Sequence, residues 1–272
     1  MIDKSKVAIL STVINFSLYE KSSALFPAGI RRYVIDGRNG MYGIASLGYM
    51  MKKLKGKQIE WLIMADEDVI FLNPDAVFGI IDEMKEKNIM FSGVRDGGSI
   101  NHRTFNPHVI NTFFSILNFS ELEKIWNKKE MLANQFTTDN EFEDELEKLE
   151  YQFDRNSLYE PYYCFYLWLR RKSAKALFLG SSGLPNDEIA NAVHDLNGNI
   201  MLYHTWYSRV YKVVDRHTQR IDTIFNSIPA ENKRQYEEPV IFKDQTFAFR
   251  KKLKKVYPKI VSMLWANKNQ TI

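Results

Sequence analysis

An apolar run that ends in three consecutive acids constrains this chain more than any other feature. Residues 61–65, Trp-Leu-Ile-Met-Ala, carry no charge, and Asp66, Glu67 and Asp68 follow at once. A continuous apolar run of this length predicts a strand covered on both faces, as at the centre of an α/β sheet. In extended backbone, Asp66 and Asp68 would point to one side of the strand and Glu67 to the other. Ligands of such sheets bind beyond the carboxyl ends of the strands, so we expect a binding site at these acids.

Two carboxylates that point the same way repel each other unless a cation lies between them. Hard divalent ions prefer such oxygen ligands, and Mg²⁺ typically takes one or two carboxylates together with substrate phosphates. The sequence therefore predicts a metal–phosphate site at Asp66 and Asp68. The alternative is a hairpin or loop in which these acids are solvated.

The first hundred residues alternate between predicted strands and helices. Strands are expected where short apolar segments end in turn residues, and helices where apolar side chains recur every three or four positions. Asn73 and Pro74 fit the N-cap and the first position of one helix. The predicted strands are 6–13, 32–35, 58–65 and 89–94, and the predicted helices are 44–54 and 74–87. This alternation is typical of an α/β protein with a wound, largely parallel sheet and helices on its faces.

The second half of the chain is less regular. Residues 120–150 are charged and expected to be helical, 161–169 form an aromatic helix, and 175–180 and 199–204 are the last predicted strands. Neither an internal repeat nor a Gly/Ser-rich linker divides the 272 residues. We therefore expect one compact domain over residues 1–235, followed by a basic, helical extension over 236–272.

Composition places the protein among ordinary globular chains. Apolar residues make up 45% of the sequence, and the net charge of +4 is small but unevenly spread. Residues 139–150 contain seven acids, whereas 250–259 contain six bases. The single cysteine, Cys164, excludes an internal disulfide and a cysteine-based zinc cluster, which fits a reducing compartment. The apolar residues 7–14 are too short to span a bilayer, so we expect a soluble, cytoplasmic protein or one at most peripheral to the inner membrane face.

The sequence Met64–Val69, with an Asn-Pro pair downstream, resembles the DxD motif of GT-A fold glycosyltransferases. In that family a hydrophobic strand ends in this motif, which holds Mn²⁺ or Mg²⁺ against the diphosphate of a nucleotide-sugar donor. The resemblance covers the N-terminal third as an architecture. It implies a GT-A-like (Rossmann-like) domain in which residues 1–100 bind the nucleotide sugar and 101–235 bind the acceptor.

The same resemblance implies roles for individual residues at the ends of the predicted strands. Asp66 would lie near the ribose or the metal, and Asp68 would be a metal ligand. Thr12 and Val13, at the end of the first predicted strand, would border the nucleoside base.

Asp36 and Arg38 follow the second predicted strand. The resemblance implies that Asp36 approaches the base or the ribose. Arg38 suits a phosphate contact, because a guanidinium pairs well with phosphate oxygens. The alternative for both residues is a simple turn.

His204 ends the strand predicted at 199–204. Many GT-A enzymes supply a late histidine as a further metal ligand, and the placement of His204 is similar; neutral imidazole suits Mn²⁺ as it does other first-row ions. The alternative is a hydrogen-bonded structural histidine. Arg209 could neutralise the leaving diphosphate, or it is a surface base.

An inverting transferase needs a carboxylate beside the acceptor hydroxyl, because that hydroxyl loses its proton during attack. Glu160, at the start of the aromatic helix, and Asp187 are the catalytic candidates, with Glu188 and Asp195 as further carboxylates. Glu160 and Asp187 could instead be acids that stabilise a helix start. A polar loop could contact the donor sugar or the acceptor, or form a flexible connection; its residues are Gly97, Gly98, Asn101, His102 and Arg103.

Residues 247–259 mix bases with aromatic side chains. This segment would suit an anionic membrane surface, where each base contributes ~1 kcal/mol, or it is a solvated basic helix end. Nothing else in the sequence resembles a nucleic-acid-binding module, so we expect no nucleic-acid partner.

Together these features predict a metal-dependent glycosyltransferase of the hexosyltransferase type, with Mn²⁺ or Mg²⁺ as its cofactor. It would move a sugar from a nucleotide-sugar donor to a glycan or lipid-linked acceptor, in bacterial surface polysaccharide synthesis by analogy of fold. Two alternatives remain open. One is a haloacid-dehalogenase-like phosphohydrolase that uses the same acids, and the other is an inactive carbohydrate-binding protein on the same fold.

Overall fold

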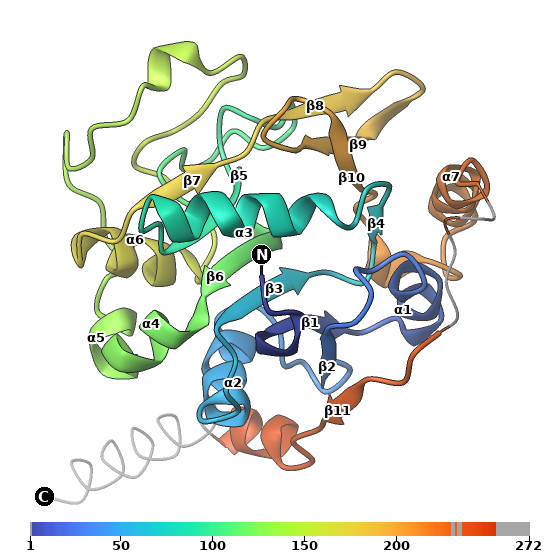
Figure 1. Ribbon diagram of the computed structural model, residues 1–272, viewed down its shortest axis with the longest axis horizontal. Helices are drawn as coiled ribbons and strands as arrows, with labels where there is room; N and C mark the ends of the chain where they lie inside the picture. Colours follow the sequence, from blue (N-terminus) through green and yellow to red (C-terminus); the bar gives the residue numbers. More distant parts are fainter. Residues whose placement is uncertain (1, 230–231, 233–235, 254–272) are drawn as a thin grey trace, which may run out of the picture.

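The computed structural model describes residues 2–229, 232 and 236–253, and within these ranges a seven-stranded sheet forms the centre of the protein (Figure 1). Its strands are β1 (Val7–Val13), β2 (Arg31–Asp36), β3 (Trp61–Ala65), β5 (Phe91–Arg95), β6 (Ile110–Asn118), β7 (Ala176–Phe178) and β11 (Val240–Phe242). They are ordered β11-β2-β1-β3-β6-β5-β7. The strands β11, β2, β1 and β3 are parallel, and β7 is parallel to β5. Strand β6 runs antiparallel to its neighbours β3 and β5.

The predicted fold class, α/β with a central, mostly parallel sheet flanked by helices, is confirmed. The strands predicted in the first half of the sequence are present with ends shifted by a few residues, as are those predicted at 175–180 and 199–204. Strand β6 was not expected as a strand. It lies between β3 and β5, so the sheet is mixed at its centre.

A second sheet of four strands packs beside the first and is antiparallel throughout, in the order β4-β10-β9-β8. Its strands are β4 (Val69–Phe71), β8 (Ser181–Leu184), β9 (Asp187–His194) and β10 (Ile200–His204). Because β4 follows β3 after three residues, the chain passes from one sheet to the other through the acids at 66–68. These acids therefore lie where the two sheets meet (Figure 1).

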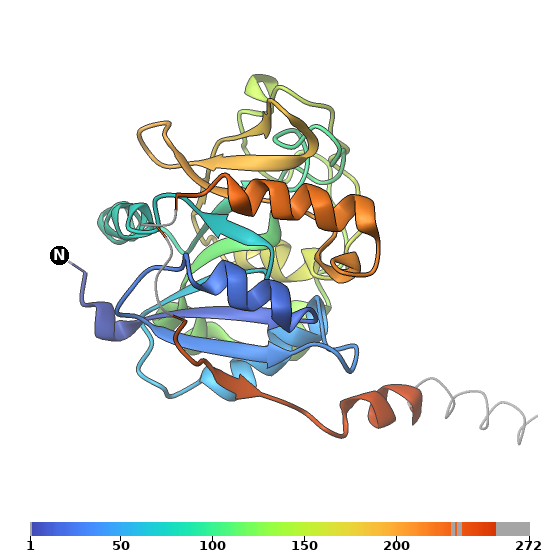
Figure 2. The same ribbon diagram turned by 90° about the vertical axis from the view of Figure 1, so that its right-hand side faces the viewer.

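Helices cover both faces of the central sheet, and β3 shows how the burial is divided. Trp61, Ile63 and Ala65 belong to one hydrophobic core, which also includes residues of the second sheet, whereas Leu62 and Met64 belong to another. The first core is closed by α1 (Phe16–Ser23), α3 (Ala76–Glu86) and α7 (Asp215–Asn226). The second is closed by α2 (Ile44–Leu54), α4 (Phe119–Ile125) and α6 (Tyr163–Arg171). Figure 2 shows α1 and α7 on one side of the central sheet. Both faces of β3 are buried, as its apolar sequence predicts.

Two local predictions are wrong. Helix α3 begins at Ala76 with Asp75 at its N-cap, rather than with Asn73 in that position. Residues 120–150 are mostly irregular, with α4, α5 (Lys128–Leu132) and a 3-10 turn at Leu146–Lys148 in place of a continuous helix. Their acids bind distant bases instead: Asp144 pairs with Arg170 and Glu141 with Arg171. Two acids of this segment are thus engaged in tertiary ion pairs, which local helix propensity does not report.

The chain after residue 235, predicted to be an extension, contributes β11 to the edge of the central sheet, parallel to β2. A short helical segment follows at residues 247–253. Residues 254–259 of the predicted basic segment lie outside the described residues. No helix in the described part of the chain is long and apolar enough to cross a membrane.

Candidate active site

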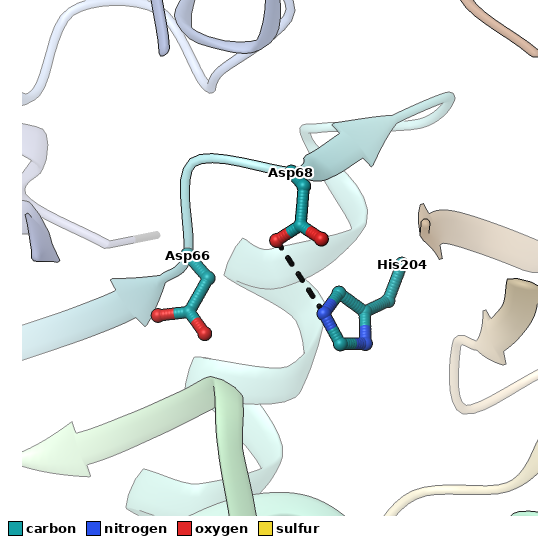
Figure 3. Close-up of side chains that lie close together, drawn as sticks. All are labelled: Asp66, Asp68 and His204. Carbon is teal, nitrogen blue, oxygen red and sulfur yellow. Dashed lines mark ion pairs between the residues drawn. The ribbon is translucent and has the colours of Figure 1, made fainter. Parts of the chain in front are cut away.

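The acids at the end of β3 lie in a turn. The amide of Val69 donates to the carbonyl of Asp66 at 3.1 Å, so the chain turns between β3 and β4 and is not extended as the sequence suggested. The turn nevertheless directs the carboxylates of Asp66 and Asp68 into one region, as Figure 3 shows. The expected convergence of these two acids is confirmed, although its cause is a turn between two sheets rather than the pleat of one strand.

Glu67 points away from this pair and binds the start of another element. Its carboxylate accepts hydrogen bonds from the amides of Ile14 (3.3 Å) and Asn15 (3.2 Å), at the end of β1. Burial, together with the charge of Asp68, raises the pKa of Glu67 to about 7, and the two amides oppose this shift. Glu67 therefore ties the acidic turn to β1 and α1.

His204 completes a group of three potential metal ligands. Strand β10 pairs antiparallel with β4, with His204 opposite Val69, which brings the imidazole Nε2 to 3.4 Å from Oδ1 of Asp68 (Figure 3). One ligand atom each from Asp66, Asp68 and His204 lies within 4.8 Å of the others. The amide of Thr205 donates to the carbonyl of Asp68 at 3.2 Å and fixes this arrangement.

Aromatic rings hold the imidazole of His204 in place. Phe113 stacks on it, with ring centres 4.1 Å apart and an angle of 9° between the planes. The ring centre of Trp206 lies 4.2 Å from that of His204. The indole Nε1 of Trp206 donates to Oδ1 of Asn191 in β9 at 2.7 Å. These contacts hold the ring of His204 beside the carboxylates. A metal-binding histidine needs its ring orientation fixed in this way.

The chemistry of this group fits a divalent cation. The side chains of Asp68 and His204 are 2% and 4% exposed. Burial, followed by the charges of Asp68 and Glu67, raises the pKa of Asp66 well above its usual range, while Arg209 opposes the shift. Within the described residues, no lysine or arginine forms an ion pair with Asp66 or Asp68. The half-buried carboxylate of Asp66, the buried carboxylate of Asp68 and one imidazole nitrogen are a ligand set that suits Mn²⁺, and the carboxylates also suit Mg²⁺.

A cleft of about 430 Å³ opens beside Asp66, at the carboxyl ends of β1 and β3 in the central sheet. It is lined from both halves of the chain: Thr12 and Ile14 come from the end of β1, and Ser208 and Arg209 follow β10. The guanidinium of Arg209 lies over the ring of Tyr42, 4.3 Å from its centre. This contact joins the segment after β10 to the segment that precedes α2. The predicted site residues that line this cleft are Thr12, Asp66, Arg103, Glu160 and Arg209.

The structure places three predicted binding residues outside the lining of this cleft. The side chain of Val13 is fully buried in the core. Asp36 accepts two hydrogen bonds from the guanidinium of Arg38, at 2.9 and 2.7 Å, and Arg38 also lies over the ring of Phe16. Asp36 and Arg38 thus form the turn that was the alternative to a nucleotide contact.

Asp187 is also outside the cleft, and its carboxylate is already engaged. Oδ1 accepts from the amides of Ile189 and Ala190, and Arg220 pairs with both oxygens at 3.2 and 3.0 Å. Burial would raise the pKa of Asp187, but these partners hold it below its usual value. Arg220 also donates to the carbonyls of Thr205 and Trp206. Asp187 therefore supports the backbone after His204 and does not face the cleft as a catalytic acid or base would.

Of the other carboxylates, Glu188 is exposed on β9. Asp195 caps the turn between β9 and β10 by accepting from the amides of Asn197 and Asn199. Neither residue lines the cleft.

A buried polar cluster that the sequence did not reveal supports the far side of the cleft. Asp96, at the end of β5, is fully buried and pairs with Arg103 through two hydrogen bonds of 2.8 Å. Asn111 and the hydroxyl of Tyr163 also donate to Asp96. Arg103 in turn reaches Oε1 of Glu160 at 3.4 Å. Sequence patterns could not show that Asp96 pairs with residues from other segments, such as Tyr163. The local signal was a run of polar residues after β5.

The remaining loop residues have mainly structural contacts. Gly97 bridges to Thr104, and a Cβ at Gly97 would lie 2.0 Å from the carbonyl oxygen of Phe105, so only glycine fits. Gly98 has a φ of +80°, which also favours glycine. Nδ1 of His102 donates to Oδ1 of Asn101 at 2.7 Å, and the ring lies edge-on to Trp206. The loop therefore positions Arg103 and supports Trp206.

No protein-family model matches the sequence, and no curated protein matches it. Several solved structures are similar in fold. Glycosyltransferases are among them. A mannosyltransferase from Pyrobaculum calidifontis, in complex with GDP-Man and Mn²⁺, is 10% identical with a TM-score of 0.34 over 50% of this chain and 49% of its own. This chain therefore spans about half the length of that protein.

Two further structures show the same level of likeness. A Drosophila galactosyltransferase, solved with manganese, UDP-Gal and xylobiose, is 14% identical with a TM-score of 0.39 over 86% of this chain and 82% of its own. Mouse xyloside xylosyltransferase is 10% identical with a TM-score of 0.36 over 64% and 84%.

Proposed function

We propose that this protein is a metal-dependent glycosyltransferase of the hexosyltransferase type. It would move a sugar from a nucleotide-sugar donor to a glycan or lipid-linked acceptor. One observation carries the proposal: Asp66, Asp68 and His204 converge within 4.8 Å, next to a cleft that also contains a cation, Arg209, and a carboxylate, Glu160. The metal ligands and Arg209 would stabilise a diphosphate, and Glu160 would accept the proton of an attacking hydroxyl.

The donor diphosphate is assigned to the part of the cleft between Asp66 and Arg209. Asp66, Asp68 and His204 would hold Mn²⁺ or Mg²⁺, which when bound would stabilise negative charge on the departing diphosphate. Arg209 also lines the cleft and supplies a guanidinium, which suits phosphate oxygens. Thr12 and Ile14, at the end of β1, would border the nucleoside.

Glu160 is assigned as the base that accepts the proton of the acceptor hydroxyl. The acceptor oxygen forms a bond to the anomeric carbon while the bond from that carbon to the donor phosphate oxygen breaks. The bonding electron pair leaves with the nucleoside diphosphate, and the proton passes to Glu160. Its carboxylate is 30% exposed and held by Arg103, so it is both accessible and oriented.

The proposed biological setting is bacterial surface polysaccharide synthesis at the cytoplasmic face of the membrane. The basic residues of 247–259 would provide peripheral contact with anionic lipid. In this proposal residues 1–235 remain the catalytic part of the chain, to whose central sheet residues 240–242 add the edge strand β11.

The test is calorimetric titration with UDP-, GDP-, CMP- and TDP-linked sugars, each with Mn²⁺ and with EDTA. We expect one nucleotide class to bind only with metal, and Asp68→Asn to abolish that binding. The matched control is Asp82→Asn, which changes an exposed acid of α3. Metal-independent binding, or equal affinities in both variants, would refute the proposal. Hydrolysis of p-nitrophenyl phosphate without nucleotide-sugar binding would favour the phosphohydrolase, and binding without transfer or donor hydrolysis would favour the inactive carbohydrate-binding protein.

A further inference from the structure

A second cavity, of about 600 Å³, adjoins the cleft. It lies between α2, residues 160–162 and the segment 244–251 near the C-terminal end of the described chain. Four residues line both spaces, namely Tyr42, Gly43, Glu160 and Tyr162. Glu160 therefore stands at the junction of the two cavities. An acceptor in the second cavity would meet the proposed base where the donor sugar would lie.

The walls of this cavity combine apolar surface with basic groups. Tyr42, Tyr49 and Phe247 provide aromatic surface, whereas Lys52, Lys128 and Lys251 bring ammonium groups to the lining. The acid Asp244 also lines the cavity, but Arg250 pairs with it at 2.6 Å and so offsets its charge. The cations thus outnumber the acids that remain.

Two of these lysines have no ion-pair partner among the described residues: Lys52 of α2 and Lys128 of α5. A Cβ at Gly48 would lie 3.4 Å from Nζ of Lys128, so the missing side chain at 48 lets this ammonium group rest against α2. Lys251 is less available, because its Nζ donates to the carbonyl of Gly40 at 3.2 Å. Lys52 and Lys128 are therefore the pair best able to bind an external anion.

We infer that the second cavity is the acceptor site and that the acceptor is an amphiphilic phosphate, in which a phosphate group is joined to an apolar chain. This inference rests on the proposed function and selects the lipid-linked class of acceptor. Lys52 and Lys128 bind the phosphate, the apolar walls cover the first part of the chain, and the acceptor hydroxyl reaches Glu160 at the junction. A neutral glycan would leave the two ammonium groups without a partner.

The test measures binding alone, in EDTA and without nucleotide sugar, so that it does not depend on transfer. Calorimetry compares octyl phosphate with octyl β-glucoside, which is neutral, and with inorganic phosphate, which lacks the chain, all below micelle-forming concentration. We expect octyl phosphate to bind at least tenfold more tightly than either. Equal binding of octyl β-glucoside would overturn the assignment of an anionic acceptor, and equal binding of inorganic phosphate would overturn its amphiphilic part.

Variants locate the site. The double variant Lys52→Met/Lys128→Met is expected to weaken octyl phosphate binding about tenfold and to leave metal-dependent nucleotide-sugar binding unchanged. The control, Lys85→Met/Lys129→Met, changes two exposed lysines outside the cavity and alters net charge equally. Equal loss in both double variants, or none in the first, would overturn the site. Loss of nucleotide-sugar binding in Asp68→Asn tests the transferase separately, so the two ideas can fail independently.

Discussion

Nε2 of His204 lies 3.4 Å from Oδ1 of Asp68, although the two residues come from opposite halves of the chain. Their proximity follows from the register of β4 and β10, in which His204 faces Val69. Phe113 and Trp206 then fix the imidazole plane. The candidate metal site therefore lies where two sheets join: Asp66 follows β3 of the central sheet, and Asp68 and His204 adjoin the paired strands β4 and β10 of the second.

The first prediction concerns this histidine. His204→Ala should lower the affinity for Mn²⁺ at least tenfold. Mutating a residue that only orients a metal ligand typically lowers metal affinity about 10–100-fold, and losing the ligand itself should cost at least as much. Mn²⁺ titration followed by electron paramagnetic resonance measures the affinity directly. The control is His217→Ala, which removes an imidazole of α7 that stacks on Tyr207 and is not part of the ligand group. Unchanged affinity in His204→Ala would exclude this residue as a ligand.

The second prediction concerns the proposed base. Glu160→Gln should slow transfer by about 10²–10⁴-fold, the usual contribution of general base catalysis, because an amide cannot accept the hydroxyl proton. Donor affinity should stay the same, since Glu160 is not among the metal ligands. Initial-rate kinetics and donor titration separate the two effects. Glu188→Gln alters an exposed carboxylate and should behave as wild type; turnover in Glu160→Gln that matches it would remove Glu160 from the mechanism.

The third prediction concerns the buried pair that supports the cleft. Arg103→Met should lower the free energy of unfolding by about 3 kcal/mol, because it leaves the fully buried Asp96 without its cation. Urea denaturation measures the loss. In Asp96→Asn/Arg103→Met the loss should be smaller, since no unpaired charge remains. Arg155→Met, at an exposed arginine, should change stability little. A double variant no more stable than the single one would contradict this account.

The fourth prediction is a pH dependence that arises at Asp144. Burial would raise the pKa of this carboxyl, but hydrogen bonds from His108 and Arg170 hold it well below its usual value of 3.8. A group with a lowered pKa in the folded state contributes stability above its unfolded pKa and loses it as the pH falls. The contribution of Asp144 should therefore be complete above about pH 4 and decline below it.

Asp144→Asn should be less stable than wild type by about 3 kcal/mol at pH 7, because Arg170 and Arg95 lose their buried partner. The difference should narrow as the pH falls from about 4 to 2, because the wild-type protein loses this contribution as well. Urea denaturation at each pH measures it, with the exposed Asp139→Asn as control. A difference that stays constant across this range would show that the ion pair is not its source.

Several features of the protein were predictable because they are set by neighbours along the chain. The apolar residues 61–65 predict a strand buried on both faces, and the stripe from Ile44 to Leu54 predicts α2 at its observed position. The acids after β3 and the histidine that ends β10 were also identified from their positions at strand ends. The strands and the acids need only local periodicity and the chemistry of the side chains, whereas the role of His204 also rested on the family resemblance.

The tertiary structure decided which of those side chains meet. Thr12 and Glu160 face one cleft, whereas Asp187, an equally plausible carboxylate in the sequence, is held by Arg220. The pairing of β10 with β4, which places His204 beside Asp68, depends on strand register between distant segments. Sequence periodicity reports which face of an element is buried but not which partner covers it. The sequence by itself therefore determined the α/β class and the candidates Asp66, Asp68, His204 and Glu160. Only packing determined that the first three converge beside a cleft that Glu160 lines.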